Sequence, residues 1–179
     1  MSVTLGASDG RSDTDRKALV GLSQAVYSPS ESANWPGRHL DWTKPEQDVF
    51  VVDDRLGLVS YVGAVVRNAR HNTMPIRLGG IGAVKTHPDA RGQGFAAAGL
   101  TKAMEFFGAT YPAIDFALLV CNQSLLDYYA RFGWREFRGE LLTTQKGKTE
   151  VFTFNKVMVA NIGGLAPTTG SIDLNGSPW

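Results

Sequence analysis

The stretch Thr86–Leu100, THPDARGQGFAAAGL, decides the fold because a strand, a tight turn and a helix meet in it. The apolar segment before it is expected to be a strand, and His87-Pro88 predicts the turn. The letters RGQGFA, at residues 91–96, then open a helix. Glycines let the backbone approach a ligand closely, and a helix start presents unpaired N–H groups with a positive dipole end. The stretch is therefore either a pyrophosphate-binding turn that needs no metal or an ordinary tight turn into a helix.

The chain before this stretch is rich in predicted strands. We expect strands at residues 3–5, 49–52, 58–66 (extending toward Arg70) and 74–86, and a helix through Tyr27 capped by Asp13 or Thr14. Residues 28–47, rich in Ser, Pro, Asn and aromatics, are expected to be a loop with one short helix at most. The strands on either side of His71-Asn72 predict an antiparallel hairpin.

After the stretch, helices and strands alternate. We expect a helix over residues 90–109, a buried strand at 114–120, a helix at 123–132 that Asn122 caps and Gly133 stops, and strands at 134–144 and 150–159. Lys146-Gly147-Lys148 is the expected turn between the last two strands, and residues 160–179 form a Gly/Pro-rich tail. This order predicts an α/β fold with a mixed sheet and helices on both faces.

Composition excludes several classes of protein. The chain has 179 residues, of which 43% are hydrophobic and 20% charged, so it can bury the core of one domain and is not disordered. Eighteen basic and 17 acidic residues give a net charge of +1, which offers no general field for nucleic acid or an anionic membrane. One cysteine, Cys121, excludes an internal disulfide framework. The start MSVTLGASDG does not look like a signal peptide, and we expect a cytoplasmic protein.

A dinucleotide-binding fold is one alternative. Gly92, Gly94 and Ala97 fit its glycine fingerprint, and that fold needs an acidic residue near the end of the next strand. Asp115 lies at about the right distance but at the start of the strand. The turn also follows several antiparallel strands instead of opening the fold. This reading is less favoured and stays open.

Two motifs in register give a more specific resemblance. The first motif is Arg/Gln-x-x-Gly-x-Gly/Ala after a strand, and Arg91, Gly94 and Ala96 match it. The second motif lies in NQSLLDYYARFGW, where Asn122, Tyr129 and Gly133-Trp134 match it. Together they resemble the GCN5-related N-acetyltransferase (GNAT) family over about residues 49–159. The resemblance implies an α+β-type fold with a mostly antiparallel sheet of six or seven strands, flanked by about four helices. It implies a single GNAT domain over residues 1–179, with the tail at 160–179 near the acceptor site.

The resemblance also implies a reaction. Acetyl-CoA would be the co-substrate, no metal would be needed, and a primary amine of a small molecule would attack the thioester directly through a tetrahedral intermediate. The matching cofactor-binding positions are Val84, Lys85, Thr86, Arg91, Gly92, Gln93, Gly94, Phe95, Ala96 and Asn122. The Val84 N–H is the expected oxyanion donor, and Tyr129 is the expected general acid that protonates the leaving thiolate. Tyr129 as a core tyrosine and Asn122 as a plain helix cap are the structural alternatives.

A general base is missing from its usual place. Many relatives carry a carboxylate on the strand before the turn, where this chain reads GGIGAVKT, residues 79–86. His87 in the turn is more often structural than catalytic, and Cys121 is more often a small hydrophobe than a nucleophile. An acetyl-CoA-binding module with little transfer activity is therefore a second hypothesis.

The acceptor is expected to meet the loop at residues 28–47 and the tail. Candidate acceptor contacts are Trp35, Asp41, Gly82 and Trp179. Within the family, YARFGW and the final Gly-x-x-Trp are similar to aminoglycoside 2'-N-acetyltransferases. That group has an acid where this chain has Gly82, and an acidic run where it has Lys146-Gly147-Lys148. Homodimers are common in the family, and nothing in the sequence decides this.

Overall fold

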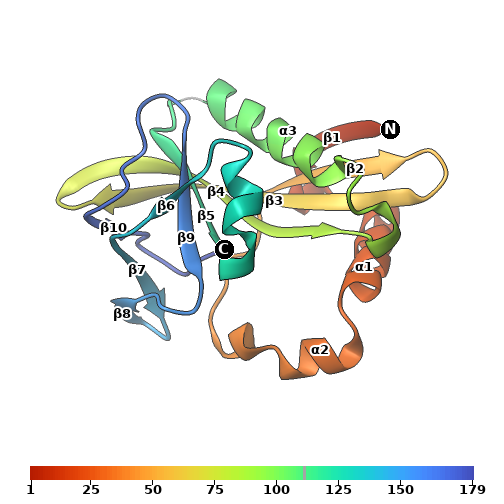
Figure 1. Cartoon of the computed structure of the whole chain (residues 1–179), viewed down its shortest axis with the longest axis horizontal. Helices are drawn as coiled ribbons and strands as arrows, with labels where there is room; N and C mark the ends of the chain where they lie inside the picture. Colours follow the sequence, from red (N-terminus) through yellow and green to blue (C-terminus); the bar gives the residue numbers. More distant parts are fainter. Residues whose placement is uncertain (111) are drawn as a thin grey trace.

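The computed structural model describes residues 1–110 and 112–179. Within these residues, ten strands form one mixed sheet flanked by four α-helices (Figure 1). The strands are β1 Ser2–Ala7, β2 Gln47–Asp53, β3 Gly57–His71, β4 Met74–Thr86, β5 Phe116–Cys121, β6 Arg135–Phe137, β7 Glu140–Gln145, β8 Lys148–Val151, β9 Lys156–Asn161 and β10 Ser171–Asp173. The helices are α1 Asp13–Val26, α2 Pro29–Asn34, α3 Phe95–Ala109 and α4 Leu126–Ala130. The expected α+β architecture is confirmed, and the expected six or seven strands are too few.

The β3–β4 hairpin is the centre of the sheet. The two strands pair antiparallel from His71 opposite Met74 to Ser60 opposite Thr86, as the alternating sequence predicts. Asn72 adopts φ +53° in the tight turn between them, a conformation that Asn tolerates well. The hairpin therefore carries the chain directly to the turn before α3.

Helices cover both faces of this hairpin. On one face, Leu100, Ala103 and Phe107 of α3 pack in one core with Val62 of β3 and Ile81 of β4. On the other face, α1 lies against the hairpin, and the Lys85 ammonium donates a hydrogen bond of 3.0 Å to Ser23 of α1. Because side chains alternate along a strand, neighbouring residues of β4 face different helices. None of the helices described for residues 1–110 and 112–179 has the length and apolarity needed to cross a membrane.

Two helix starts differ from expectation. Ser12 caps α1 in place of Asp13 or Thr14, and it shares a capping box with Asp15. The helix expected from residue 90 begins only at Phe95, because Gly92 and Gly94 adopt φ +76° and +83°. These left-handed residues cannot belong to the helix, so they form a turn before it.

The C-terminal third contains more strands than expected. The single strands expected at residues 134–144 and 150–159 are each divided in two, giving β6 with β7 and β8 with β9. Gly139 lies at the first division, where a Cβ would come within 2.0 Å of the Gly170 carbonyl oxygen. The tail contributes β10, which lies between β3 and β7. The end of the chain therefore returns to the middle of the molecule, as Figure 1 shows.

Candidate functional site

The site begins where two parallel strands separate. β4 and β5 pair from Leu78 opposite Phe116 to Ile81 opposite Leu119, and their pairing ends there although both strands continue. Two cavities open at this separation. The first cavity has a volume of about 690 Å³ and lies beside α3 and α4, so it is called the α3–α4 cavity. The second has a volume of about 440 Å³ and is called the tryptophan cavity, because Trp35, Trp42 and Trp179 line it. Val84 and Tyr129 line both cavities.

A β-bulge in β4 lies at the junction of the cavities. Tyr61 pairs with Lys85 and Gly63 with Gly82, so Val62 alone faces Ala83 and Val84. Ala83 adopts φ +52°, in the left-handed region. A bulge leaves its extra residue outside the regular ladder of hydrogen bonds and re-aims the neighbouring peptide. The bulge therefore lies where Val84 was expected to offer its N–H to the reacting group.

The turn before α3 borders the α3–α4 cavity. Of the predicted cofactor-binding residues, the structure brings together Val84, Lys85, Thr86, Arg91, Gly92, Gly94, Phe95 and Ala96 along this cavity. A Cβ built on Gly92 or Gly94 would meet no atom within 4 Å, so the space above the turn is open. Unpaired N–H groups at a helix start and an open glycine turn suit a phosphate-bearing molecule. These residues fit the pyrophosphate of acetyl-CoA.

Two predicted cofactor residues lie elsewhere. The Gln93 side chain donates a hydrogen bond of 3.0 Å back to the Asp89 carbonyl and does not line the α3–α4 cavity. Asn122 lines the tryptophan cavity, and its Oδ1 accepts a hydrogen bond of 3.0 Å from the Ser124 N–H. Asn122 therefore performs the capping role that was its structural alternative.

Tyr129 occupies the junction of the two cavities. It lies on α4, 5% exposed, and contacts Trp134 edge-on with ring centroids 6.3 Å apart. Burial, together with the neighbouring Cys121, Tyr128 and Tyr27, raises the pKa of the Tyr129 hydroxyl far above the ordinary value for tyrosine. The hydroxyl therefore keeps its proton at neutral pH, as a proton donor must.

The expected acceptor contacts divide in two groups. Trp35, Gly82 and Trp179 line the tryptophan cavity, and a Cβ on Gly82 would come within 2.7 Å of the main-chain carboxyl carbon of Trp179. Asp41 does not line this cavity: its carboxylate accepts a hydrogen bond of 2.9 Å from the Lys146 N–H. The lining residues of the tryptophan cavity include no Asp, Glu, Lys, Arg or His.

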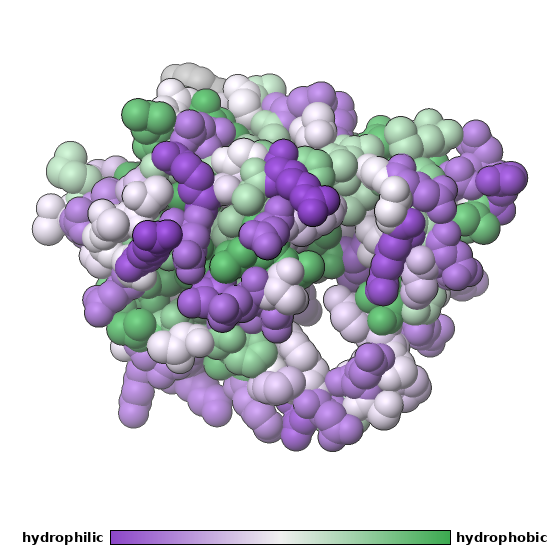
Figure 2. Space-filling model, viewed as in Figure 1, coloured by the Kyte–Doolittle hydropathy of each residue, from purple (hydrophilic) through white to green (hydrophobic). Residues whose placement is uncertain are grey.

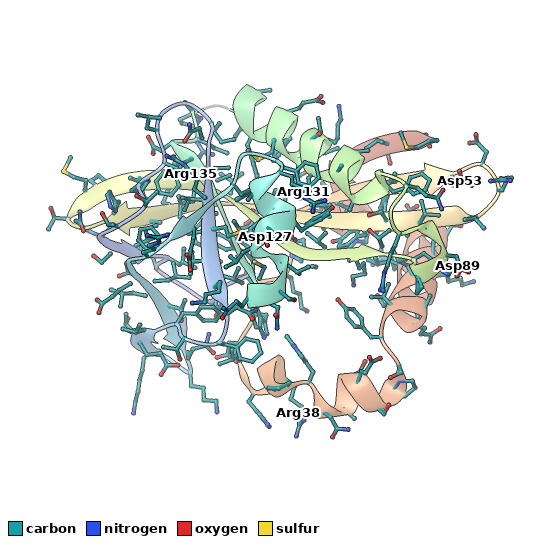
Figure 3. All side chains as sticks on the ribbon, in the orientation of Figure 1. Arg38, Asp53, Asp89, Asp127, Arg131 and Arg135 are labelled. Carbon is teal, nitrogen blue, oxygen red and sulfur yellow. The ribbon has the colours of Figure 1, made fainter. Side chains whose placement is uncertain are left out.

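Among the lining residues that were not predicted, three bear on the site. Tyr27, which follows α1, lines both cavities, as does Leu125. Arg131, labelled in Figure 3, directly follows α4 and lines the α3–α4 cavity together with Arg91. The role of Arg131 could have been predicted, because it is a basic residue two positions after Tyr129, the expected general acid. Tyr27 is distant in sequence from both motifs, so only the fold reveals its position.

His87 and Cys121 have surroundings that suit structural roles. The His87 Nδ1 accepts a hydrogen bond of 3.3 Å from the Asp89 N–H and so caps the short turn at residues 88–90. Burial raises the pKa of the Cys121 thiol to about 11, which keeps it protonated and weakly nucleophilic at neutral pH.

Several solved structures share the fold of this chain. Escherichia coli ElaA is 16% identical, with a TM-score of 0.62 over 89% of this chain and 99% of that chain. An acyl-CoA N-acyltransferase from Pseudomonas aeruginosa is 16% identical, with a TM-score of 0.60 over 89% and 98%. The GNAT family N-acetyltransferase YhbS from Escherichia coli, solved in complex with CoA, is 13% identical, with a TM-score of 0.60 over 96% and 89%. No curated protein sequence matches the chain.

A family model matches the sequence itself. The model of the acetyltransferase (GNAT) family aligns with residues 17–134, which is more than half of the chain. The match includes the bulge, the glycine turn, Asn122 and Tyr129. The chain belongs to the GNAT family of acetyltransferases.

Proposed function

We propose that this protein transfers an acetyl group from acetyl-CoA to a primary amine of a small molecule by direct attack. The observation that carries the proposal is the position of Val84 and Tyr129 at the junction of the α3–α4 cavity and the tryptophan cavity. A donor in one cavity and an amine in the other would meet beside both residues. The family match supports acyl transfer, and YhbS, of the same fold, was solved with CoA.

The residues have complementary roles in the proposed reaction. Acetyl-CoA, when bound, supplies the activated acetyl group. Residues 91–96 and the side chains of Arg91 and Arg131 hold its phosphates, because helix N–H groups and guanidinium groups are suited to phosphate oxygens. The backbone of β4 beyond the bulge lies along the same cavity and aligns the remainder of the molecule.

The proposed step forms one bond and breaks another. A bond forms between the amine nitrogen and the acetyl carbon, and the bond between that carbon and sulfur breaks. The Val84 N–H donates a hydrogen bond to the oxygen on which negative charge develops. Tyr129 donates its proton to the departing sulfur, the amine nitrogen loses one proton to water, and water returns a proton to the Tyr129 oxygen. No base is assigned, since no Asp, Glu or His side chain is among the residues that line the tryptophan cavity.

The cavity favours a small acceptor that is not a polycation. Its volume of about 440 Å³ is in the range of small-molecule sites. The narrower expectation of an aminoglycoside 2'-N-acetyltransferase receives no support from the comparisons. The lining adds no support from side chains, because an aminoglycoside carries several ammonium groups and no Asp or Glu side chain lines the cavity to pair with them.

The same absence of a base favours a second candidate, an acetyl-CoA-binding module with little transfer activity. One experiment tests both candidates: release of the CoA thiol from acetyl-CoA is measured with a panel of amines, and acetyl-CoA binding is measured by calorimetry. We expect binding and amine-dependent thiol release. Binding with no release from any amine would support the module, and absence of binding would contradict both.

A further inference from the structure

We propose that the tryptophan cavity selects an amine attached to a flat aromatic body, such as an arylalkylamine. This inference rests on the proposed function and names its acceptor class. Five aromatic side chains line the cavity: Tyr27, Trp35, Trp42, Tyr129 and Trp179. Aromatic rings attract other rings in offset or edge-on contacts beyond the effect of buried area alone.

The two tryptophans from the segment between α2 and β2 form one fixed wall. Trp35 stacks on Trp42 with ring centroids 5.5 Å apart and an angle of 29° between the planes. Phe154 contacts both rings edge-on, at 6.1 and 6.2 Å. The wall is thus assembled from two distant parts of the chain, which limits its freedom to rotate.

The polar groups of two indoles are already satisfied. The Trp42 Nε1–H donates a hydrogen bond of 2.8 Å to the Gly37 carbonyl, and the Trp179 Nε1–H donates one of 3.1 Å to the Leu118 carbonyl. These two side chains therefore offer apolar ring surface to the cavity and no spare donor. An acceptor rich in hydroxyl groups would lose its water here with few partners to replace it.

Trp35 is more exposed than a ring used only for packing needs to be. It is 42% exposed, whereas Trp179 is 5% exposed. The neighbouring Gly37 is crowded against it, since a Cβ there would come within 2.4 Å of the Trp35 ring. Figure 2 shows an opening between the α2 segment and the body of the molecule. An exposed, braced ring at a cavity mouth is suited to stack against a ligand ring.

Two basic side chains lie near the cavity. Arg67 lies over the Trp179 ring at 5.1 Å and donates hydrogen bonds to the Ser177 carbonyl and to Thr43 Oγ1. Lys85 points to the α1 face beside Tyr27. The cavity lining includes no Asp or Glu side chain, so an acceptor with a single amine suits it better than a polyamine.

The test compares amines that differ only in their ring. 2-Phenylethylamine and its saturated counterpart 2-cyclohexylethylamine are assayed by thiol release, with spermidine as a polycation. For the wild type, we expect kcat/KM for the phenyl compound to exceed that for the cyclohexyl compound by about five-fold. Equal or reversed values for the two rings, or a preference for spermidine, would overturn the aromatic acceptor.

Variants connect this preference to the tryptophan wall. Trp35→Ala should lower kcat/KM for 2-phenylethylamine by about ten-fold and abolish the preference over the cyclohexyl compound, whereas Trp35→Phe should keep the preference. Leu165→Ala, at an 84% exposed site outside the cavity lining, is the matched control. A Trp35→Ala protein that folds and keeps the preference would overturn the proposal.

A binding measurement separates this proposal from the proposed function. The near-ultraviolet circular dichroism of the Trp35–Trp42 pair is recorded while 2-phenylethylamine is added without acetyl-CoA. A saturable change that Trp35→Ala abolishes, together with no thiol release from any amine, would support the aromatic site and contradict acetyl transfer. Thiol release with amines of other classes and no spectral change would contradict the aromatic site and leave acetyl transfer standing.

Discussion

Ala83 and its neighbour Val84, both in β4, lie opposite the single residue Val62 of β3. The backbone of Ala83 adopts φ +52° at this position. An L-residue with a Cβ has a cost of about 1–2 kcal/mol in this left-handed region. The strained residue lies one position before the proposed oxyanion donor. Strain of this kind persists where the surrounding structure holds it, and it is often found at functional sites.

Replacing Ala83 tests whether the bulge sets the geometry of the site. Ala83→Val adds a β-branched side chain at a left-handed position and should destabilise the protein by about 1–2 kcal/mol. Because the new side chain favours extended backbone, the bulge should shift and kcat should fall as well. Urea unfolding and thiol-release assays measure the two effects.

Ala83→Gly is the matched control, since glycine adopts a positive φ without strain. This variant should keep the wild-type fold and most of the activity. If Ala83→Val were as stable and as active as Ala83→Gly, the bulge would have no role in holding Val84.

Tyr129→Phe tests the proposed proton donor. Removing the hydroxyl should lower kcat by about 100-fold or more, while acetyl-CoA binding is retained. Because burial raises the pKa of Tyr129, the donor form should persist beyond pH 10, the ordinary value for tyrosine. The wild-type kcat should therefore show no loss from this group between pH 7 and pH 10.

Tyr128→Phe is the control for Tyr129→Phe. Tyr128 contacts Tyr129 edge-on at 5.2 Å and lines the α3–α4 cavity but not the tryptophan cavity. Removing the Tyr128 hydroxyl should leave kcat close to the wild-type value. Similar kcat losses in both variants would mean that packing of α4, and not the Tyr129 proton, determines the rate.

Local patterns in the sequence predict the elements near the reaction centre well. Alternating apolar residues predict the β3–β4 hairpin, and the glycines at 92 and 94 indicate a turn, although the helix was expected to start at residue 90 and α3 starts at Phe95. The position of β10 could not be predicted, because Ser171–Asp173 pairs with residues about 30 and 100 positions away. Its three residues carry no alternation long enough to indicate a strand.

The acceptor side of the site was also predicted less well, because it too depends on contacts between residues that are far apart in the sequence. Trp35, Trp42 and Trp179 come together only through long-range packing of the segment between α2 and β2 on the end of the chain. Asp41 resembles a substrate contact in sequence, but it is used in a hydrogen bond to the turn after β7. Residue type alone does not show on which side of a loop a carboxylate lies.

Cys121 should take no part in covalent catalysis. Burial raises the pKa of its thiol to about 11, so the thiolate is scarce at pH 8. Incubation with acetyl-CoA should give no mass increase of one acetyl group on the intact protein, and iodoacetamide should react only after denaturation. An acetylated Cys121 in the folded protein would contradict direct attack.

Asp48 should stabilise the fold in a pH-dependent manner. Its carboxylate is 1% exposed; burial by itself raises its pKa, but hydrogen bonds from Arg11, Ser8 and Tyr61 outweigh burial and lower it. A lowered folded-state pKa stabilises the protein above the unfolded value near 3.9, and this stabilisation is lost as the pH falls through the folded value. Asp48→Asn should therefore cost about 3 kcal/mol at pH 7, and the difference from wild type should shrink in acid.

Asp13→Asn is the control for Asp48→Asn. Asp13 forms an exposed ion pair of 3.7 Å with Arg16, and such pairs contribute little to stability. Urea unfolding at neutral and acidic pH should show a small, nearly constant effect for this variant. An equally small effect of Asp48→Asn would mean that the ion pair between Asp48 and Arg11 does not stabilise the fold.

Gly80→Ala tests how tightly the end of the chain is held under the sheet. A Cβ at Gly80 would come within 2.1 Å of Trp179 Cε2, so the indole must move and its hydrogen bond to the Leu118 carbonyl must break. Overpacking of this kind costs about 1–3 kcal/mol. Displacing Trp179 also removes one ring from the tryptophan cavity, so acceptor KM should rise more than acetyl-CoA KM.

Gly21→Ala, within α1 and with no atom within 4 Å of the added Cβ, should instead stabilise the protein by about 0.5–1 kcal/mol. Opposite signs of the two effects in urea unfolding would establish the contact between Gly80 and Trp179, and a stabilised Gly80→Ala would contradict it.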